Sequence, residues 1–87
     1  MEQAPAFDRE ADARGLLCPL PVLRARKLLL AMREGEVLRI AATDPAAVID
    51  MPHFAQTAGH RLLAQLGGEG GATYYYLARG PDRPEAE

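Results

Sequence analysis

The chain contains one cysteine, Cys18, within the run GLLCPLP at residues 15–21. A lone thiol has no second cysteine in the chain to form a disulfide, so its chemistry is that of a single nucleophile. The run separates a predicted strand from a predicted helix, which places Cys18 at a helix N-terminus. Unpaired backbone N–H groups and the positive end of the helix dipole lie there, and both favour the thiolate, the nucleophilic form. The sequence therefore predicts a reactive thiol at this turn.

Residues close to Cys18 in the sequence are expected to hold the thiol in place. Gly15 ends the predicted strand, and Pro19 favours an extended conformation for Cys18. Pro21 stiffens the same turn, and proline is tolerated in the first turn of a helix. Arg14 is expected to add positive potential. The alternative is a buried structural thiol, because a free cysteine often behaves as a small hydrophobic residue.

Two kinds of single-thiol chemistry are open to Cys18. A cysteine hydrolase needs a positioned base and an oxyanion site, and the two histidines, His53 and His60, have no local signature that ties them to Cys18. A sulfur carrier needs an accessible thiolate that attacks a sulfane sulfur and holds it as a persulfide. Because the chain lacks a resolving cysteine, the bound sulfur would leave by attack from a partner. One-thiol carriage therefore suits the chain better than dithiol redox catalysis.

Composition narrows the classes of protein further. The 87 residues are enough for one small domain, and 48% of them are hydrophobic, as in globular chains. The net charge of −2 gives no electrostatic case for nucleic acid or an anionic membrane. The sequence has no recognisable signal peptide and no apolar stretch long enough to span a bilayer. With one unpaired cysteine, these features predict a cytoplasmic protein.

Hydrophobic periodicity and the positions of glycine and proline predict a β-α-β-α-β-β order. Strands are expected at residues 10–14, 37–43, 61–66 and 72–79, and Leu38, Ile40 and Ala42 alternate on one side of the second strand. Helices are expected at residues 19–33 and 52–58, the second after a short helical turn that Pro52 breaks. The strand-helix-strand unit implies parallel pairing, and the glycines at 67–71 imply a hairpin. The predicted fold is an α/β (α+β) two-layer sandwich with two helices on one face of a four-stranded mixed sheet. It occupies residues 9–80, between a flexible leader at 1–8 and a flexible tail at 81–87.

The first helix has a predicted core face and a predicted outer face. The core face carries Val22, Ala25, Leu29 and Met32. Leu23 and Leu30 then lie away from the core at seven-residue spacing, flanked by Arg26 and Lys27. With Leu20, they predict a basic-rimmed apolar strip that leads to Cys18 and would dock a partner with acidic residues. The alternative is an ordinary solvated face with scattered leucines.

Other polar residues have structural interpretations. Asp44 and Asp50 are most simply helix caps, and their alternative role is hydrogen bonding that orders the loops near Cys18. Two histidines and one cysteine at these distances match no common zinc spacing, so no metal is expected. No cofactor is expected either. Tyr74, Tyr75 and Tyr76 should be divided between core and surface, because side chains alternate along a strand.

Several blocks of the sequence together resemble the TusA/SirA family of small sulfur carriers. The blocks are GLLCPLP, Arg26-Lys27, GEVL at 35–38, ATDP at 42–45, DMP at 50–52, Gly59-His60 and Tyr76-Leu77. The resemblance covers residues 12–79, and Leu20 departs from it, because an acidic or small polar residue is common between the two prolines.

The resemblance implies a two-layer β-α-β-α-β-β sandwich and a persulfide on Cys18. The sulfur would come from a cysteine desulfurase or rhodanese-type donor and pass to an acceptor protein in tRNA thiolation, molybdenum cofactor assembly or sulfur oxidation. Two alternatives remain open. One is a non-catalytic binding or regulatory module in which Cys18 is structural; the other, disfavoured by the acidic balance, is single-stranded RNA binding over the open sheet face.

Overall fold

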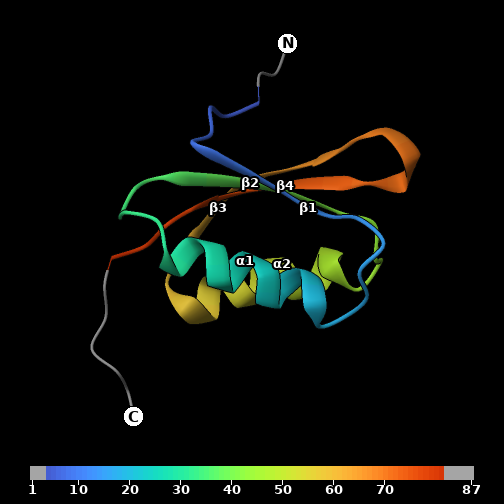
Figure 1. The fold of residues 1–87 in the computed structure, drawn as a ribbon, viewed down its shortest axis with the longest axis horizontal. Helices are drawn as coiled ribbons and strands as arrows, with labels where there is room; N and C mark the ends of the chain where they lie inside the picture. Colours follow the sequence, from blue (N-terminus) through green and yellow to red (C-terminus); the bar gives the residue numbers. More distant parts are fainter. Residues whose placement is uncertain (1–3, 82–87) are drawn as a thin grey trace.

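The computed structural model describes residues 4–81 and has the predicted order of elements (Figure 1). These are β1 (Arg9–Ala13), α1 (Leu20–Leu30), β2 (Val37–Ala42), α2 (Ala47–Ala58), β3 (Arg61–Gly67), a short 3-10 turn (Glu69–Gly71) and β4 (Thr73–Ala78). Both helices lie on one face of the four-stranded sheet (Figure 1). The predicted two-layer sandwich is confirmed. No helix within residues 4–81 is long and apolar enough to cross a membrane.

The sheet has the strand order β1-β2-β4-β3. β1 pairs with β2 in parallel, whereas β4 pairs antiparallel with both β2 and β3. A parallel pair requires a crossover connection, and α1 supplies it. Because β1 and β2 run in the same direction, their carboxyl ends meet at one end of the sheet. The loop into α1 and the turn into α2 therefore start side by side (Figure 1).

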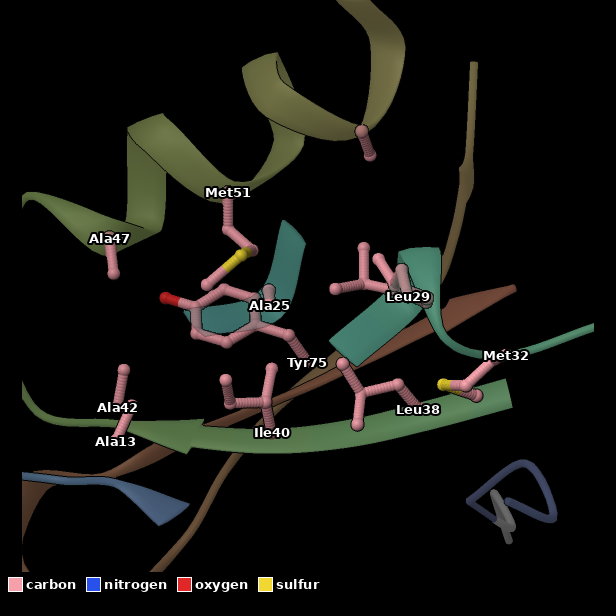
Figure 2. Packing of buried hydrophobic residues seen from close by; sticks show 12 residues of the cluster. Ala13, Ala25, Leu29, Met32, Leu38, Ile40, Ala42, Ala47, Met51 and Tyr75 are labelled. Atoms are coloured by element: carbon pink, nitrogen blue, oxygen red, sulfur yellow. The ribbon is translucent and has the colours of Figure 1, made fainter. Parts of the chain in front are cut away.

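The hydrophobic core fills the space between the sheet and the two helices. Figure 2 shows Ala25 and Leu29 of α1, Leu38 and Ile40 of β2, Met51 of α2 and Tyr75 of β4 pointing into this layer. The alternation predicted for β2 is confirmed, since Leu38, Ile40 and Ala42 are all buried. Of the core residues predicted for the first helix, Ala25 and Leu29 are buried within α1 and Val22 is partly buried. Met32 is buried as well, but it lies beyond the end of α1 at Leu30, because the helix is shorter than predicted. Burial of these side chains fixes which face of each helix is left for other contacts.

The second helix differs from the prediction. α2 runs without a break from Ala47 to Ala58 and contains Pro52, where the sequence predicts an interruption. Proline removes one helical N–H donor, and an interior position is normally destabilising. Here Ala47, Met51 and Ala55 are buried against the core on both sides of Pro52. Their packing holds one continuous helix across the missing donor.

The segment before β1 also differs from the expected leader. Asp8 exchanges two hydrogen bonds of 2.8 Å with the Val37 backbone, one from its own N–H and one to its carboxylate. Phe7 lies edge-on to Tyr76, with ring centroids 6.2 Å apart, and 4.7 Å from the Arg39 guanidinium. These residues extend the ordered domain before residue 9. Residues 1–3 of the leader and 82–87 of the tail lie outside the described residues.

The face of the sheet opposite the helices carries two of the three consecutive tyrosines of β4. Tyr75 is fully buried in the core, whereas Tyr74 and Tyr76 lie on the opposite face, where their strand register places them beside β2 residues. Arg39 of β2 lies 4.6 Å from the Tyr74 ring centroid and pairs with Glu10 of β1. The predicted alternation of the three tyrosines between the two faces is confirmed, but Tyr76 is only 2% exposed on the outer face, beside Phe7, so a surface position is wrong for this residue.

Candidate functional site

The loops that follow β1 and β2 come together around Cys18. Gly15 turns the chain out of the sheet with φ +81°, a left-handed conformation that glycine adopts without strain. Its N–H donates a 2.9 Å hydrogen bond to the Thr43 hydroxyl, in the turn after β2. This contact joins segments 28 residues apart in the sequence. Cys18 follows in the same loop, with its side chain exposed and its peptide bond to Pro19 in the cis form.

Two carboxylates hold Cys18. The backbone N–H of Cys18 donates to Asp44 Oδ2 at 2.6 Å, and its Sγ donates to Asp50 Oδ2 at 3.2 Å. The second carboxylate oxygen of Asp44 accepts a 3.2 Å bond from Ala46 N–H. Asp44 therefore bridges the loop before α1 and the turn before α2, while Asp50 reaches the thiol from within α2. With Pro19, Pro21, Val22 and Ala47, these residues line a shallow recess at the thiol.

These contacts correct the predicted roles of the two aspartates. Asp50 is the fourth residue of α2 and does not cap it, and the helix begins after Ala46 with no side-chain cap. Asp44 does bond Ala46 N–H in the preceding turn, but its shorter bond is to Cys18. The alternative role, hydrogen bonding that orders the loops near Cys18, describes both residues.

The electrostatics of the site also differ from the prediction. The pKa of Cys18 is raised above its usual value, first by the thiol's hydrogen bond to Asp50, then by desolvation and by the negative charges of Asp50 and Asp44. Both carboxylates favour the neutral thiol. The prediction that the surroundings of Cys18 favour a thiolate is therefore wrong for the free chain.

Two features were expected to supply positive potential at Cys18, namely Arg14 and the N-terminus of the first helix. In the structure, Arg14 pairs with an aspartate, and the helix N-terminus has fewer backbone N–H donors than expected. Arg14 makes a double hydrogen bond to Asp12, with Nε–Oδ1 and Nη2–Oδ2 distances of 2.9 and 3.0 Å. This pairing lowers the pKa of Asp12 to about 2. At the start of α1, the Leu20 N–H bonds the Leu17 carbonyl at 2.8 Å. The prolines at positions 19 and 21 have no N–H, so they remove two donors that a helix N-terminus would otherwise direct at a thiol.

The predicted strip on α1 is an exposed surface. Leu20, Leu23 and Leu30 are 49%, 49% and 57% exposed, and Arg26 and Lys27 are exposed between them. The same face continues into a groove of about 640 Å³ between α1 and the edge strand β1, lined in part by Leu20, Leu23 and Lys27. The geometry agrees with the predicted apolar strip with basic residues. Its role in docking stays a prediction.

Sequence reasoning missed three exposed apolar residues near the site. Leu17 is 67% exposed directly before Cys18, and Val48 and Ile49 of α2 are 45% and 75% exposed. Val48 and Ile49 directly precede Asp50, so they form a second apolar surface on the α2 side of the thiol. Their exposure follows from helical spacing once the helix starts at Ala47, because Ala47 and Met51 take the core face. Because the sequence predicts a break at Pro52, it does not predict that Val48 and Ile49 belong to the exposed face of one continuous helix.

Neither histidine forms a hydrogen bond with the Cys18 thiol. His53 is exposed on α2, and the Nδ1 atom of His60 accepts a 2.8 Å hydrogen bond from the Gly80 N–H. The backbone N–H of His60 donates a 2.8 Å hydrogen bond to the Ala55 carbonyl and helps to close α2. The group in contact with the Cys18 thiol is the carboxylate of Asp50. Among residues 4–81, no group of three or more His, Cys, Asp or Glu side chains could hold a metal ion.

Comparisons with known proteins agree with this architecture. The family model described as sulfurtransferase TusA matches residues 9–78. The sulfur carrier protein TusA of Allochromatium vinosum is 47% identical over 73 residues, which cover 84% of this chain and 93% of that protein. The putative sulfur carrier protein YrkI of Bacillus subtilis is 34% identical over 73 residues, or 84% and 96% of the two chains.

A solved structure is similar in fold. The crystal structure of a SirA-like protein from Desulfitobacterium hafniense superposes with a TM-score of 0.75 at 24% identity. The match covers 85% of this chain and all of that one. The order of elements, the exposed cysteine and these similarities lead to one assignment. This chain belongs to the TusA family of sulfurtransferases.

Proposed function

We propose that this chain is a sulfur-relay carrier in which Cys18 holds the travelling sulfur as a persulfide. The observation that carries the proposal is the exposure of Cys18, the one cysteine of a TusA-family chain, at a loop fixed by the 2.6 Å bond to Asp44. A thiol with a packing role would be buried. An exposed thiol on an ordered loop is available to a partner protein.

The proposed transfer exchanges one S–S bond for another. The Cys18 thiol loses its proton to solvent, and its sulfur attacks the terminal sulfur of a donor's cysteine persulfide. The donor's S–S bond breaks, and the donor sulfur leaves with the electron pair and takes up a proton. The products are a donor thiol and a Cys18 persulfide, with no net oxidation. A thiol of an acceptor repeats the exchange and returns Cys18 to the thiol form.

The outer face of α1 is the proposed docking surface. Leu20, Leu23 and Leu30 supply apolar contact area, and Arg26 and Lys27 favour a partner with acidic residues around its own cysteine. The proposed donor is a cysteine desulfurase or a rhodanese-type protein. The acceptor is a protein of tRNA thiolation, molybdenum cofactor assembly or sulfur oxidation, and the carrier makes no direct contact with nucleic acid. We place the relay in the cytoplasm, where thiols stay reduced.

Intact-mass measurement tests this proposal. The chain is incubated with a cysteine desulfurase and cysteine, or with a rhodanese and thiosulfate, and the gain of one sulfur atom is measured. The expected gain is reversed by a reducing thiol and absent from a folded Cys18→Ser variant. If no donor loads the wild-type chain, the proposal is wrong.

The same experiment separates the carrier from a non-catalytic binding module. The exposed leucines of α1 suit either protein. Slow alkylation of Cys18 would not distinguish them, because Asp50 raises the thiol's pKa although the residue is exposed. Loading with sulfur does distinguish them. A binding module would engage partners equally well with Cys18→Ser.

A further inference from the structure

The free chain keeps its thiol in a form that is unsuited to attack. The charged groups that face Cys18 are Asp44, at its backbone N–H, and Asp50, at its sulfur. The other residues that line the recess, Pro19, Pro21, Val22 and Ala47, carry no charge. Thiol exchange proceeds through the thiolate, so a positive charge placed at this site at the moment of transfer would raise the rate of attack.

The described part of the chain does not place that charge at the thiol. Its two ion pairs are Arg14–Asp12 and Arg39–Glu10, and neither includes the carboxylates at Cys18. Arg24 of α1 donates at 2.7 Å to the Asp12 carbonyl. No cation within residues 4–81 forms an ion pair with Asp44 or Asp50, so a cation that pairs with them would come from outside these residues.

We propose that Asp50 holds Cys18 as a dormant thiol in the free carrier, and that the partner supplies an arginine or lysine side chain that pairs with Asp50 and releases the thiolate. The inference rests on the proposed sulfur relay and names the chemistry that its donors and acceptors must present. The partner's cation draws the Asp50 oxygen away from Sγ, and the thiol proton passes to solvent. Cys18 then attacks as described above.

The arrangement of charges also fixes how such a partner sits. The carboxylates of Asp44 and Asp50 lie on the α2 side of Cys18, whereas Arg26 and Lys27 lie on α1. A complementary partner presents its cation toward α2 and its acidic residues toward α1. The exposed side chain of Ile49, next to Asp50, offers apolar contact beside the cation. A partner docked in the reverse orientation would meet like charges on both sides.

Small disulfides of different charge can stand in for the partner's cation. Purified chain reacts at pH 7 with cystamine, which carries two ammonium groups, or with the neutral 2-hydroxyethyl disulfide, and mixed-disulfide formation is followed by mass. The measured quantity is the ratio of the two rate constants. A unit charge held about 5 Å from Asp50 in water changes this ratio roughly fourfold. The matched control is Glu34→Gln, which removes an exposed carboxylate elsewhere and lowers the negative charge by the same amount.

The expected result has two parts. Asp50→Asn lowers the cystamine preference roughly fourfold, a loss that shrinks in 1 M salt, and Glu34→Gln leaves it unchanged. Asp50→Asn also raises the rate with neutral iodoacetamide at pH 7, because the thiol proton is held less strongly. An unchanged preference in Asp50→Asn, or an iodoacetamide rate that does not rise, overturns the inference.

These probes contain no sulfane sulfur, so they test the dormant thiol separately from the relay. Failed sulfur loading of the wild-type chain, with the cystamine preference intact, refutes the proposed function alone. Successful loading with no dependence of the probe rates on Asp50 refutes this inference alone.

Discussion

Replacing Asp44 with alanine should loosen the site and destabilise the fold together. The Asp44 carboxylate accepts two backbone hydrogen bonds, at 2.6 Å from Cys18 and at 3.2 Å from Ala46. It joins residues 26 apart in the sequence, and the residue is half-buried. A hydrogen bond to a charged group contributes about 1.5–3 kcal/mol, and an ordinary one about 1 kcal/mol. The longer bond is the weaker of the two, so Asp44→Ala should lower the free energy of unfolding by about 2–3 kcal/mol.

The asparagine variant separates charge from geometry. An amide side chain at this position keeps one carbonyl oxygen, enough for the bond to Cys18 N–H, so Asp44→Asn should cost about 1 kcal/mol. Urea denaturation measures both changes. For a domain of this size, the alanine variant should melt roughly 10–20 °C lower, at about 4–8 °C per kcal/mol. Glu34→Ala, which removes an exposed carboxylate, is the control and should stay within about 0.5 kcal/mol of wild type.

The same variants report on the position of the thiol. If Asp44 fixes the loop, Asp44→Ala should slow sulfur loading from a protein donor more than Asp44→Asn does, because the cysteine loop loses its contact with the turn before α2. A loss of less than about 0.5 kcal/mol in Asp44→Ala would refute the reasoning. It would mean that the 2.6 Å contact contributes nothing beyond what water supplies.

Three further predictions concern the core, a close contact and the docking surface. The buried Tyr75 hydroxyl makes no hydrogen bond of good geometry within residues 4–81, although the Thr73 side chain approaches it. Tyr75→Phe should therefore keep or raise stability, by up to about 1 kcal/mol; a fall of that size in urea denaturation would show that Thr73 bonds the hydroxyl. A Cβ on Gly80 would lie 1.8 Å from the backbone carbonyl oxygen of Gly59, directly after α2, so Gly80→Ala should lower the free energy of unfolding by about 1–3 kcal/mol. Gly67 has open space around it, so Gly67→Ala should lower the free energy of unfolding by less. Replacing Arg26 and Lys27 with glutamate should slow loading from a protein donor roughly tenfold at low salt and less at high salt; equal slowing with a small-molecule persulfide would contradict a docking role.

Local sequence patterns were sufficient to predict the order of helices and strands and the two-layer fold. The alternation of Leu38, Ile40 and Ala42 predicted β2 and its buried face, and the glycines at 67–71 predicted the hairpin that pairs β3 with β4. Pro52 misled the prediction of α2, because the rule against proline inside a helix is local, whereas the packing of Met51 and Ala55 is tertiary. Packing against the sheet decided the outcome.

The electrostatics of Cys18 could not be predicted in the same way. Its two carboxylate partners, Asp44 and Asp50, lie 26 and 32 residues away in the sequence. The sequence offered contacts with the loops near Cys18 as an alternative to helix capping for both residues, but it did not predict that the Asp50 carboxylate reaches the thiol itself. Arg14, which is close in sequence, pairs with Asp12 instead. Pro19 and Pro21 could have given a warning, because a helix that starts with prolines directs fewer N–H groups at a thiol. The sequence located the nucleophile, and only the fold revealed the charge around it.

A raised thiol pKa has opposite consequences for the two halves of a sulfur relay. A thiolate of higher pKa is intrinsically more nucleophilic, but it is a poorer leaving group. Once deprotonated, Cys18 is thus suited to take sulfur from a donor, whereas it releases sulfur slowly while Asp50 lies beside the departing thiolate. A cation placed against Asp50 eases both steps, because it frees the thiolate for attack and stabilises the same thiolate when sulfur leaves. Donor and acceptor would then need the same positive group at the same place, even where the rest of their surfaces differ. On this reasoning, the acidic pair at Cys18 selects partners by one shared feature and leaves the thiol quiescent between encounters.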